Sequence, residues 1–302
     1  YYLFYTVLLR KDNIAMESPV GVCMARSDDG LTWEPVDTGK SLVPGYNNVI
    51  LAGNPAPGGS CVYYDADDTD PNRRYKVTIS PVGRIETGIA IIPSIVQCSP
   101  DGIEWSPCGE GEFLPYHSDT YNSLLRNPVT GRYQITLRRR WGERRVCLVE
   151  SENFSEWTKP RAILHPTSID PVSTHFYGMP QFYIRDSGIF VGFLWNQHMP
   201  YNDVMGGPVQ TEYAYSYDGL MWNRSHELSI GLRERGEFGG GSMYASALIE
   251  REEDILVYSV ARLEEHGRIK EIMDERGASG VLLPGTLRKD GFVSLSSKYG
   301  MG

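Results

Sequence analysis

A seven-residue phrase recurs four times along the chain: SDDGLTW at residues 27–33, SPDGIEW at 99–105, SENFSEW at 151–157 and SYDGLMW at 216–222. The third copy is the weakest because it lacks the Asp-Gly pair. The phrases begin 72, 52 and 65 residues apart. A β-prone run, a polar turn and a Trp that return at intervals of roughly 40 to 70 residues are typical of a β-propeller.

Each phrase is predicted to form a hairpin turn between two strands. The Asp bonds its own backbone, and the Gly adopts a positive φ. The Trp opens the next strand and is expected to pack between neighbouring sheets. The third copy has no Gly, so we expect its turn to differ. We interpret all four phrases as structural and assign no catalysis to them.

The segments between the phrases are rich in β-branched and aromatic residues, and five blades are the simplest count, with four or six as less favoured alternatives. Only Glu264–Glu275 looks helical or loop-like. We therefore predict an all-β, single-domain, five-bladed β-propeller over residues 1–302. The first blade lacks an innermost strand, which would lie upstream of Tyr1. The expected blades span approximately 1–40, 47–112, 117–165, 175–230 and 240–298.

Composition narrows the function. The net charge of −9 and the absence of a dominant basic patch argue against a nucleic-acid partner. No segment reaches the ~18 apolar residues that would span a membrane. The 19 Tyr and six Trp suit both β-structure and stacking on carbohydrate. No signal peptide is visible, but the chain begins inside a strand-like run, Tyr1–Val7, so the N-terminus is expected to be incomplete and the compartment stays open.

The five cysteines, at 23, 61, 98, 108 and 147, are odd in number and not closely spaced. This pattern argues against a disulfide framework and against a zinc site. A bridge between Cys98 and Cys108 across the second phrase is the less favoured alternative.

Several further motifs resemble those of five-bladed glycosidases. They are NNVIL at 47–51, RYK at 74–76, SDTYN at 118–122, YGMP at 177–180, TEYAYS at 211–216 and RKDGFVSL at 288–295. The chain resembles glycoside hydrolase families 32, 43 and 68, with families 117 and 130 as relatives, and in particular a bacterial family-32-like or family-43-like group with poorly defined substrates. It departs from the sialidase propeller, whose turn phrase has an extra residue between Asp and Gly.

The resemblance implies a glycosidase-like site in the axial funnel, where acids come from the innermost strands and their approaches. Glycoside hydrolysis needs two carboxyl groups, one to protonate the leaving oxygen and one to activate water or attack carbon. Asp119, at the entry to the third blade's inner strand, is the first candidate. Glu212, among β-branched and aromatic residues, is the second, because desolvation would raise the pKa of a general acid.

A third carboxylate is harder to place. The resemblance puts an Asp on the missing first inner strand and often an acid before the fifth blade's inner strand. There the sequence has Gly239–Gly241, so Glu237 is the nearby candidate, and Asp170 is a further one before the fourth blade. Each has an ordinary alternative as a surface or ion-paired residue.

Candidate sugar-binding residues are polar or aromatic and lie on inner-strand approaches or strand ends. Aromatic faces stack on sugars, His and Tyr bond hydroxyl groups, and Arg binds a carboxylate or phosphate bidentately. Each is also compatible with a structural role. The set is His117, Asn122, Arg138, His175, Tyr177, Trp195, His198, Tyr244 and Arg262.

The leading hypothesis is a glycoside hydrolase acting on an oligosaccharide or glycoside through paired carboxylates in the funnel. The alternatives are a family-130-type phosphorylase, in which Arg138 and Arg139 would bind phosphate, and a carbohydrate-binding propeller without catalysis, which the glycine run at 239–241 favours. No cofactor is expected. A structural calcium ion in the central channel, which occurs in some relatives, is the one metal that the resemblance suggests.

Overall fold

The computed structural model describes residues 1–8, 20–52, 56–82, 84–85, 88–89, 94–109, 114, 116, 118, 120–141, 143–200, 206–268 and 280–292. Its one described helix is a single 3-10 turn, η1 (Pro71–Arg73). Within these residues no helix is long and apolar enough to cross a membrane.

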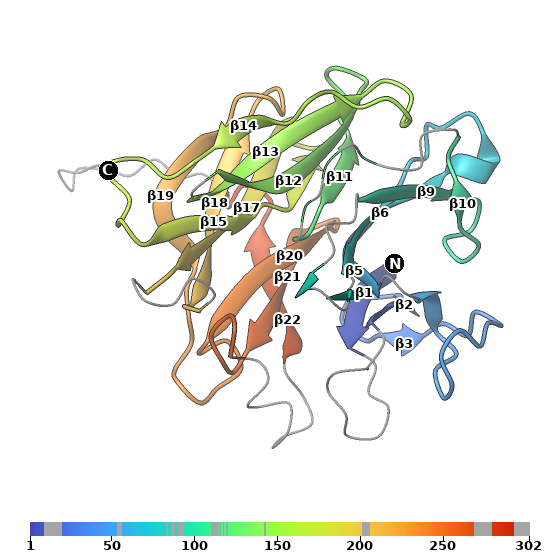
Figure 1. The fold of residues 1–302 in the computed structure, drawn as a ribbon, viewed down its shortest axis with the longest axis horizontal. Helices are drawn as coiled ribbons and strands as arrows, with labels where there is room; N and C mark the ends of the chain where they lie inside the picture. Colours follow the sequence, from blue (N-terminus) through green and yellow to red (C-terminus); the bar gives the residue numbers. More distant parts are fainter. Residues whose placement is uncertain are drawn as a thin grey trace.

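The chain is an all-β, five-bladed propeller, as predicted, and its blades follow one another in chain order around a centre (Figure 1). Blade 1 contains β1 (Tyr2–Leu8), β2 (Val20–Arg26), β3 (Glu34–Pro35) and β4 (Val49–Ala52). Blade 2 contains β5 (Ala56–Tyr64), β6 (Tyr75–Val82), β9 (Ile95–Ser99) and β10 (Ser106–Pro107). A two-stranded ribbon is formed by β7 (Arg84–Ile85) and β8 (Gly88–Ile89).

The last three blades are also built from antiparallel neighbours. Blade 3 contains β11 (Ser123–Arg126), β12 (Tyr133–Trp141), β13 (Glu143–Ser151) and β14 (Arg161–Leu164). Blade 4 contains β15 (Thr174–Gly178), β16 (Gln181–Ile184), β17 (Ile189–His198), β18 (Val209–Ser216) and β19 (Asn223–Ile230). Blade 5 contains β20 (Ser242–Glu250), β21 (Asp254–Arg262) and β22 (Val281–Arg288).

One strand lies in a different sheet from the expected one. The sequence places residues from 47 onward in blade 2, but β4 pairs with β2, with Leu51 opposite Val22 and Val49 opposite Cys23. The short strand β3 covers only Ala25 and Arg26 of β2. The other half of that edge would expose backbone donors and acceptors, and β4 satisfies them.

The repeated phrases form one shared turn. In the first copy the Ser27 hydroxyl accepts a hydrogen bond from Gly30 N at 2.8 Å, and Asp29 Oδ1 accepts from the backbone N–H groups of residues 31 and 32. The second and fourth copies repeat this arrangement, and the three glycines have φ between 74° and 79°. The predicted roles of Asp and Gly are confirmed.

The expectation that the third turn differs is wrong. Phe154 occupies the glycine position with a φ of 64°, its N–H donates to Ser151 Oγ, and Asn153 replaces the Asp as acceptor for residues 155 and 156. The left-handed conformation costs a residue with a side chain about 1–2 kcal/mol. Burial of the Phe154 ring against Tyr133 and Trp157, at centroid distances of 5.1 and 5.4 Å, offsets this cost.

Each turn contacts the preceding blade. A donor there binds a carbonyl oxygen of the turn in every case, and for three turns the distances are between 2.7 and 3.1 Å. The pairs are Asn127 Nδ2 with Asp218 O, Arg73 Nη2 with Asn153 O, Lys40 Nζ with Ile103 O, and Tyr258 Oη with Gly30 O. Because Tyr258 lies on β21, the last of these contacts joins the first blade to the fifth.

The four tryptophans of the phrases pack between blades, as predicted. Trp105 packs with Val22 and Met24 of blade 1, and Trp222 packs with Val146 of blade 3. Trp157 joins the cluster that includes residues of blades 2 and 3, and the Trp33 ring lies 6.1 Å from Tyr258. The core is therefore a series of layers between adjacent sheets rather than a single centre.

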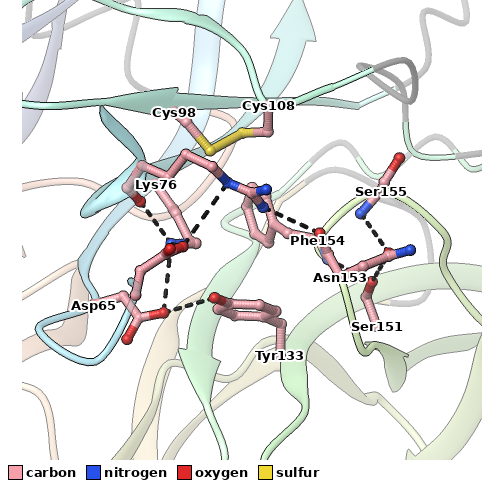
Figure 2. The surroundings of a disulfide bond; sticks show 11 residues. Asp65, Lys76, Cys98, Cys108, Tyr133, Ser151, Asn153, Phe154 and Ser155 are labelled. Atoms are coloured by element: carbon pink, nitrogen blue, oxygen red, sulfur yellow. Dashed lines mark hydrogen bonds and ion pairs between the residues drawn. A yellow bond between two sulfur atoms is a disulfide. The ribbon is translucent and has the colours of Figure 1, made fainter. Parts of the chain in front are cut away.

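A disulfide bond joins Cys98 and Cys108, contrary to the favoured prediction, with a Cα–Cα distance of 5.1 Å (Figure 2). It encloses the second phrase. Because Ser106 pairs with Cys98 across β10 and β9, the hairpin brings together the two cysteines, which are separated by 10 positions in sequence. The other three cysteines are buried and free.

Below the disulfide, a buried cation links blades 2 and 3 (Figure 2). Lys76 on β6 forms ion pairs with Asp68 at 2.7 Å and Asp65 at 3.4 Å, and its Nζ lies 5.1 Å from the ring centroid of Tyr133. The Tyr133 hydroxyl donates to Asp65 at 2.7 Å. Buried charges are tolerated when they are paired and hydrogen-bonded in this way.

The contact between a turn and the preceding blade can be separated from the turn itself. Gly219 and Gly131 have φ of 74° and 72°, but a Cβ on Gly219 would lie 2.8 Å from Asn127 Nδ2, whereas one on Gly131 would meet nothing within 4 Å. We expect Gly131→Ala to lower the free energy of unfolding by about 1–2 kcal/mol. Gly219→Ala should cost about 1–3 kcal/mol more, because the methyl group displaces the Asn127 amide. Urea unfolding of both variants measures the difference, and equal losses would contradict the docking role.

Candidate active site

Strands of all five blades surround an axial cavity of about 2120 Å³. Residues of β1, β5, β11, β16 and β20 line it, as do the ends of β15, β17 and β21. In this cavity, residues that are far apart in sequence and come from all five blades lie close together.

Three aromatic rings form a wall at one end of this cavity. Tyr177 on β15, Trp195 on β17 and Tyr244 on β20 have ring centroids 5.2 to 6.3 Å apart. The indole N–H of Trp195 donates to Ala245 O at 2.7 Å, which fixes the ring. A Cβ at Gly178 would lie 2.9 Å from the Trp195 ring, so the absence of a side chain there permits this position. We call these three residues the aromatic wall.

Two arginines pack against the Tyr177 ring of the aromatic wall. The guanidinium carbon of Arg138 lies 4.3 Å from the ring centroid of Tyr177, and that of Arg144 lies 5.9 Å from it. The ring of His266 is 4.6 Å from the Tyr177 ring, and Arg262 lines the cavity beside the wall. Five sequence-predicted residues therefore meet here: Arg138, Tyr177, Trp195, Tyr244 and Arg262.

The phenol of Tyr244 is a hydrogen-bond donor at this site. Burial raises its pKa well above the usual value, and the neighbouring Tyr177 acts in the same direction. The charges of Arg262 and Arg138 oppose the rise but do not cancel it. Tyr244, like an ordinary tyrosine, is protonated at neutral pH and carries an O–H group.

Three other predicted binding residues support the framework. The amide of Asn122 donates to Ser80 Oγ at 2.7 Å, and Asn122 is not among the residues that line the cavity. The backbone N–H of Arg144 donates to His175 Nδ1. His198 lies 3.4 Å from the hydroxyl of Thr174, and burial lowers its pKa, an effect that the charge of Asp170 opposes.

Glu212 lies elsewhere than expected. It is on β18, the third strand of blade 4, and does not line the cavity. Arg224 binds both of its oxygens, at 2.7 and 3.0 Å, and Asn196 and the His226 N–H donate to it as well. The carboxylate faces β19 rather than the axis because the inner positions of blade 4 belong to β15 and β16.

Asp170 belongs to the same buried ion-pair group. Two nitrogens of Arg224 bind its two oxygens at 2.7 and 2.8 Å. These hydrogen bonds lower the pKa of Asp170 to about 2, against the opposing effect of burial. One arginine therefore forms ion pairs with both Asp170 and Glu212, which gives these acids a structural role.

Glu237 is an exposed residue between β19 and β20, paired with Arg233 at 3.1 Å. The neighbouring glycines are explained by the lack of space for a side chain. A Cβ on Gly240 would lie 2.3 Å from Glu234 O, and one on Gly241 would lie 2.1 Å from the backbone of Glu264. The glycine run is thus a close backbone crossing, rather than evidence of a lost acid.

Asp119 and His117 lie outside the described residues. Their described neighbours contact the aromatic wall region: Ser118 Oγ accepts a hydrogen bond from Arg138 N at 3.3 Å, and Thr120 Oγ1 donates to Tyr177 O at 3.2 Å.

Sequence reasoning missed three residues at this site, namely Tyr121, Arg144 and His266. The Tyr121 ring centroid lies 5.9 Å from that of Trp195, and the other two residues contact the Tyr177 ring. His266 lies in the charged segment that was interpreted only as helical or loop-like, and its being one of six histidines was the available signal. No described group of three or more His, Cys, Asp or Glu residues is arranged to hold a metal ion.

Comparison with solved structures supports the same fold. No family model and no curated protein matches the sequence. Among solved structures, a family-32 β-fructofuranosidase of Bombyx mori matches with a TM-score of 0.62 at 12% identity, covering 96% of this chain and 58% of that one. This chain therefore spans less than two thirds of that enzyme.

Structures of two other proteins match with a TM-score of 0.60. An N-acetylgalactosamine deacetylase of F. plautii, in complex with blood group B trisaccharide, is 12% identical and covers 86% of this chain and 75% of its own. A member of the family-130 mannoside phosphorylases and hydrolases is 13% identical, with coverages of 98% and 83%. The chain is thus similar in structure to five-bladed glycoside hydrolases, including families 32, 43 and 130, at low sequence identity. Some of these structures hold carbohydrate, such as sucrose.

The Arg224 ion-pair group makes a testable prediction about acid stability. Because the pKa of Asp170 is depressed to about 2 in the folded state, its stabilisation is complete above its ordinary pKa of about 4 and is lost as the pH falls from about 4 towards 2. Asp170→Asn should therefore reduce the dependence of unfolding free energy on pH in this range. The exposed Asp28→Asn serves as the control, and an unchanged slope in Asp170→Asn would contradict the assignment.

Proposed function

We propose that the protein is a glycoside hydrolase that binds an oligosaccharide or glycoside against the aromatic wall of the axial cavity. The observation that carries this proposal is the convergence of Tyr177, Trp195 and Tyr244, from three strands of two blades, on one end of the cavity. Apolar rings with a few convergent polar groups are typical of ligand sites, and the C–H faces of sugars stack on such rings.

Asp119 is the acid that we propose for catalysis. The support is indirect: Ser118 and Thr120 are hydrogen-bonded to Arg138 and Tyr177, beside the aromatic wall. Hydrolysis needs a carboxyl group within reach of the glycosidic oxygen or of the attacking water. Glu212 is held by Arg224 and Glu237 is on the surface, so neither has comparable support.

A phosphorylase is the second candidate enzyme. The observation in its favour is the pair of guanidinium groups, Arg138 and Arg144, next to the Tyr177 ring. Phosphate is recognised by arginine forks, and a phosphorolytic reaction would use it in place of water. Dependence of product release on inorganic phosphate separates this activity from hydrolysis.

A non-catalytic carbohydrate-binding propeller is the third candidate. Its support is the engagement of both Asp170 and Glu212 by Arg224, which leaves fewer acids for chemistry. Binding of a glycan without turnover, with or without phosphate, would favour this function.

The test is product release from a broad panel of glycans and aryl glycosides, with and without phosphate. We expect phosphate-independent release by the protein, a decrease of about 100-fold or more in Asp119→Asn, and a loss of affinity of about 10-fold or more in Trp195→Ala. Tyr217→Ala removes an exposed aromatic side chain outside the cavity and should have no effect. Full activity of Asp119→Asn would refute its catalytic role.

A further inference from the structure

Arg262 is a partly buried arginine, and one nitrogen of its guanidinium lacks a hydrogen-bond partner. It ends β21, lines the axial cavity beside the aromatic wall, and its Nη1 is buried with no hydrogen-bond partner among the described residues. By contrast, the guanidinium of Arg224 is saturated by Asp170 and Glu212. No described carboxylate forms an ion pair with Arg262.

The position of Arg262 is fixed by the backbone around it. Its carbonyl oxygen accepts hydrogen bonds from Gly239 N at 2.9 Å and Gly241 N at 3.1 Å. Across β20 and β21 it lies opposite Ser242, two residues from Tyr244. A buried donor without a partner costs free energy. We therefore interpret the unpartnered nitrogen of Arg262, held in a fixed position, as one that a ligand would accept a hydrogen bond from.

The acids that line the cavity lie away from the aromatic wall, together with the cations Arg126 and Arg185. Among the described residues that line it, the acids are Asp65, Asp67 and Glu250. Glu250 lies at the far end of β20 from Ser242, about 26 Å along the strand at the usual rise per residue. Gly59 lies against the backbone of Thr120, and Asp65 is about 20 Å further along β5. Arg262, at the end with the aromatic wall, therefore lies away from these acids.

We propose that Arg262 binds the carboxylate of an acidic sugar whose ring stacks on the aromatic wall, so that the substrates are glycans containing uronic acid. This inference rests on the proposed carbohydrate-binding function and names its substrate class. A guanidinium edge matches a carboxylate in shape and charge. A uronic acid carries its carboxylate on the sugar ring itself. A ring that stacks on the aromatic wall would therefore bring its carboxylate close to an arginine beside the wall.

The experiment compares acidic glycans with neutral ones on the unaltered protein. Affinities are measured by calorimetry for oligosaccharides of galacturonic and glucuronic acid and for their carboxyl-reduced counterparts. We expect at least about 10-fold tighter binding of one acidic series, equivalent to about 1.4 kcal/mol. Arg262→Gln should abolish this preference while the affinity for the reduced glycan is retained, and Arg262→Lys should keep part of it.

Arg288→Gln is the matched control, because Arg288 is exposed and paired with Asp290 on the surface. It should leave both affinities unchanged. Equal affinity for acidic and reduced glycans, or a preference that survives in Arg262→Gln, would overturn the inference but keep the carbohydrate-binding function. Absence of binding to either series would overturn both. Inorganic phosphate that binds through Arg262, without a preference for acidic glycans, would replace the inference with a phosphate site.

Discussion

The docking of each hairpin turn on the preceding blade is the contact on which the rest of the structure depends. A carbonyl oxygen of the turn accepts a hydrogen bond from the neighbouring blade, and the Trp that follows packs between the same two sheets. Single blades have two apolar faces and would be marginal alone. The hydrogen bond from the Tyr258 hydroxyl to Gly30 O is the equivalent contact between the fifth and first blades, and it connects the last blade to the first.

This arrangement creates the candidate site as a consequence of the ring. Inner strands that are far apart in sequence lie around one axis, and the cavity between them receives Tyr177 and Trp195 from blade 4 and Tyr244 from blade 5. The buried cations of the blades differ in whether they have carboxylate partners. Lys76 and Arg224 are neutralised between or within sheets, whereas Arg262 faces the cavity without a carboxylate partner in the described structure. Only the latter pattern points towards a ligand.

The repeat shows how far sequence reasoning extends. The backbone hydrogen bonds of the Asp and the positive φ of the Gly were predicted correctly. The hydrogen bond from the Gly N–H to the Ser hydroxyl was not predicted. The third turn was not predicted correctly, because Phe154 adopts a positive φ that local preference disfavours and that burial between blades stabilises. The Cys98–Cys108 bridge was also disfavoured, since cysteine spacing alone does not contain the register of β9 and β10.

The sequence by itself determined the repeat, the all-β class, the five blades and most of the aromatic residues of the candidate site, because these depend on local turn chemistry and on residue type. Tertiary structure alone decided which acids are structural. Glu212 and Asp170 lie 42 positions apart and share Arg224, and Glu237 is paired on the surface. The role of a carboxylate depends on the charge beside it and on the face of the strand that carries it, and both are set by how distant strands pack around the axis.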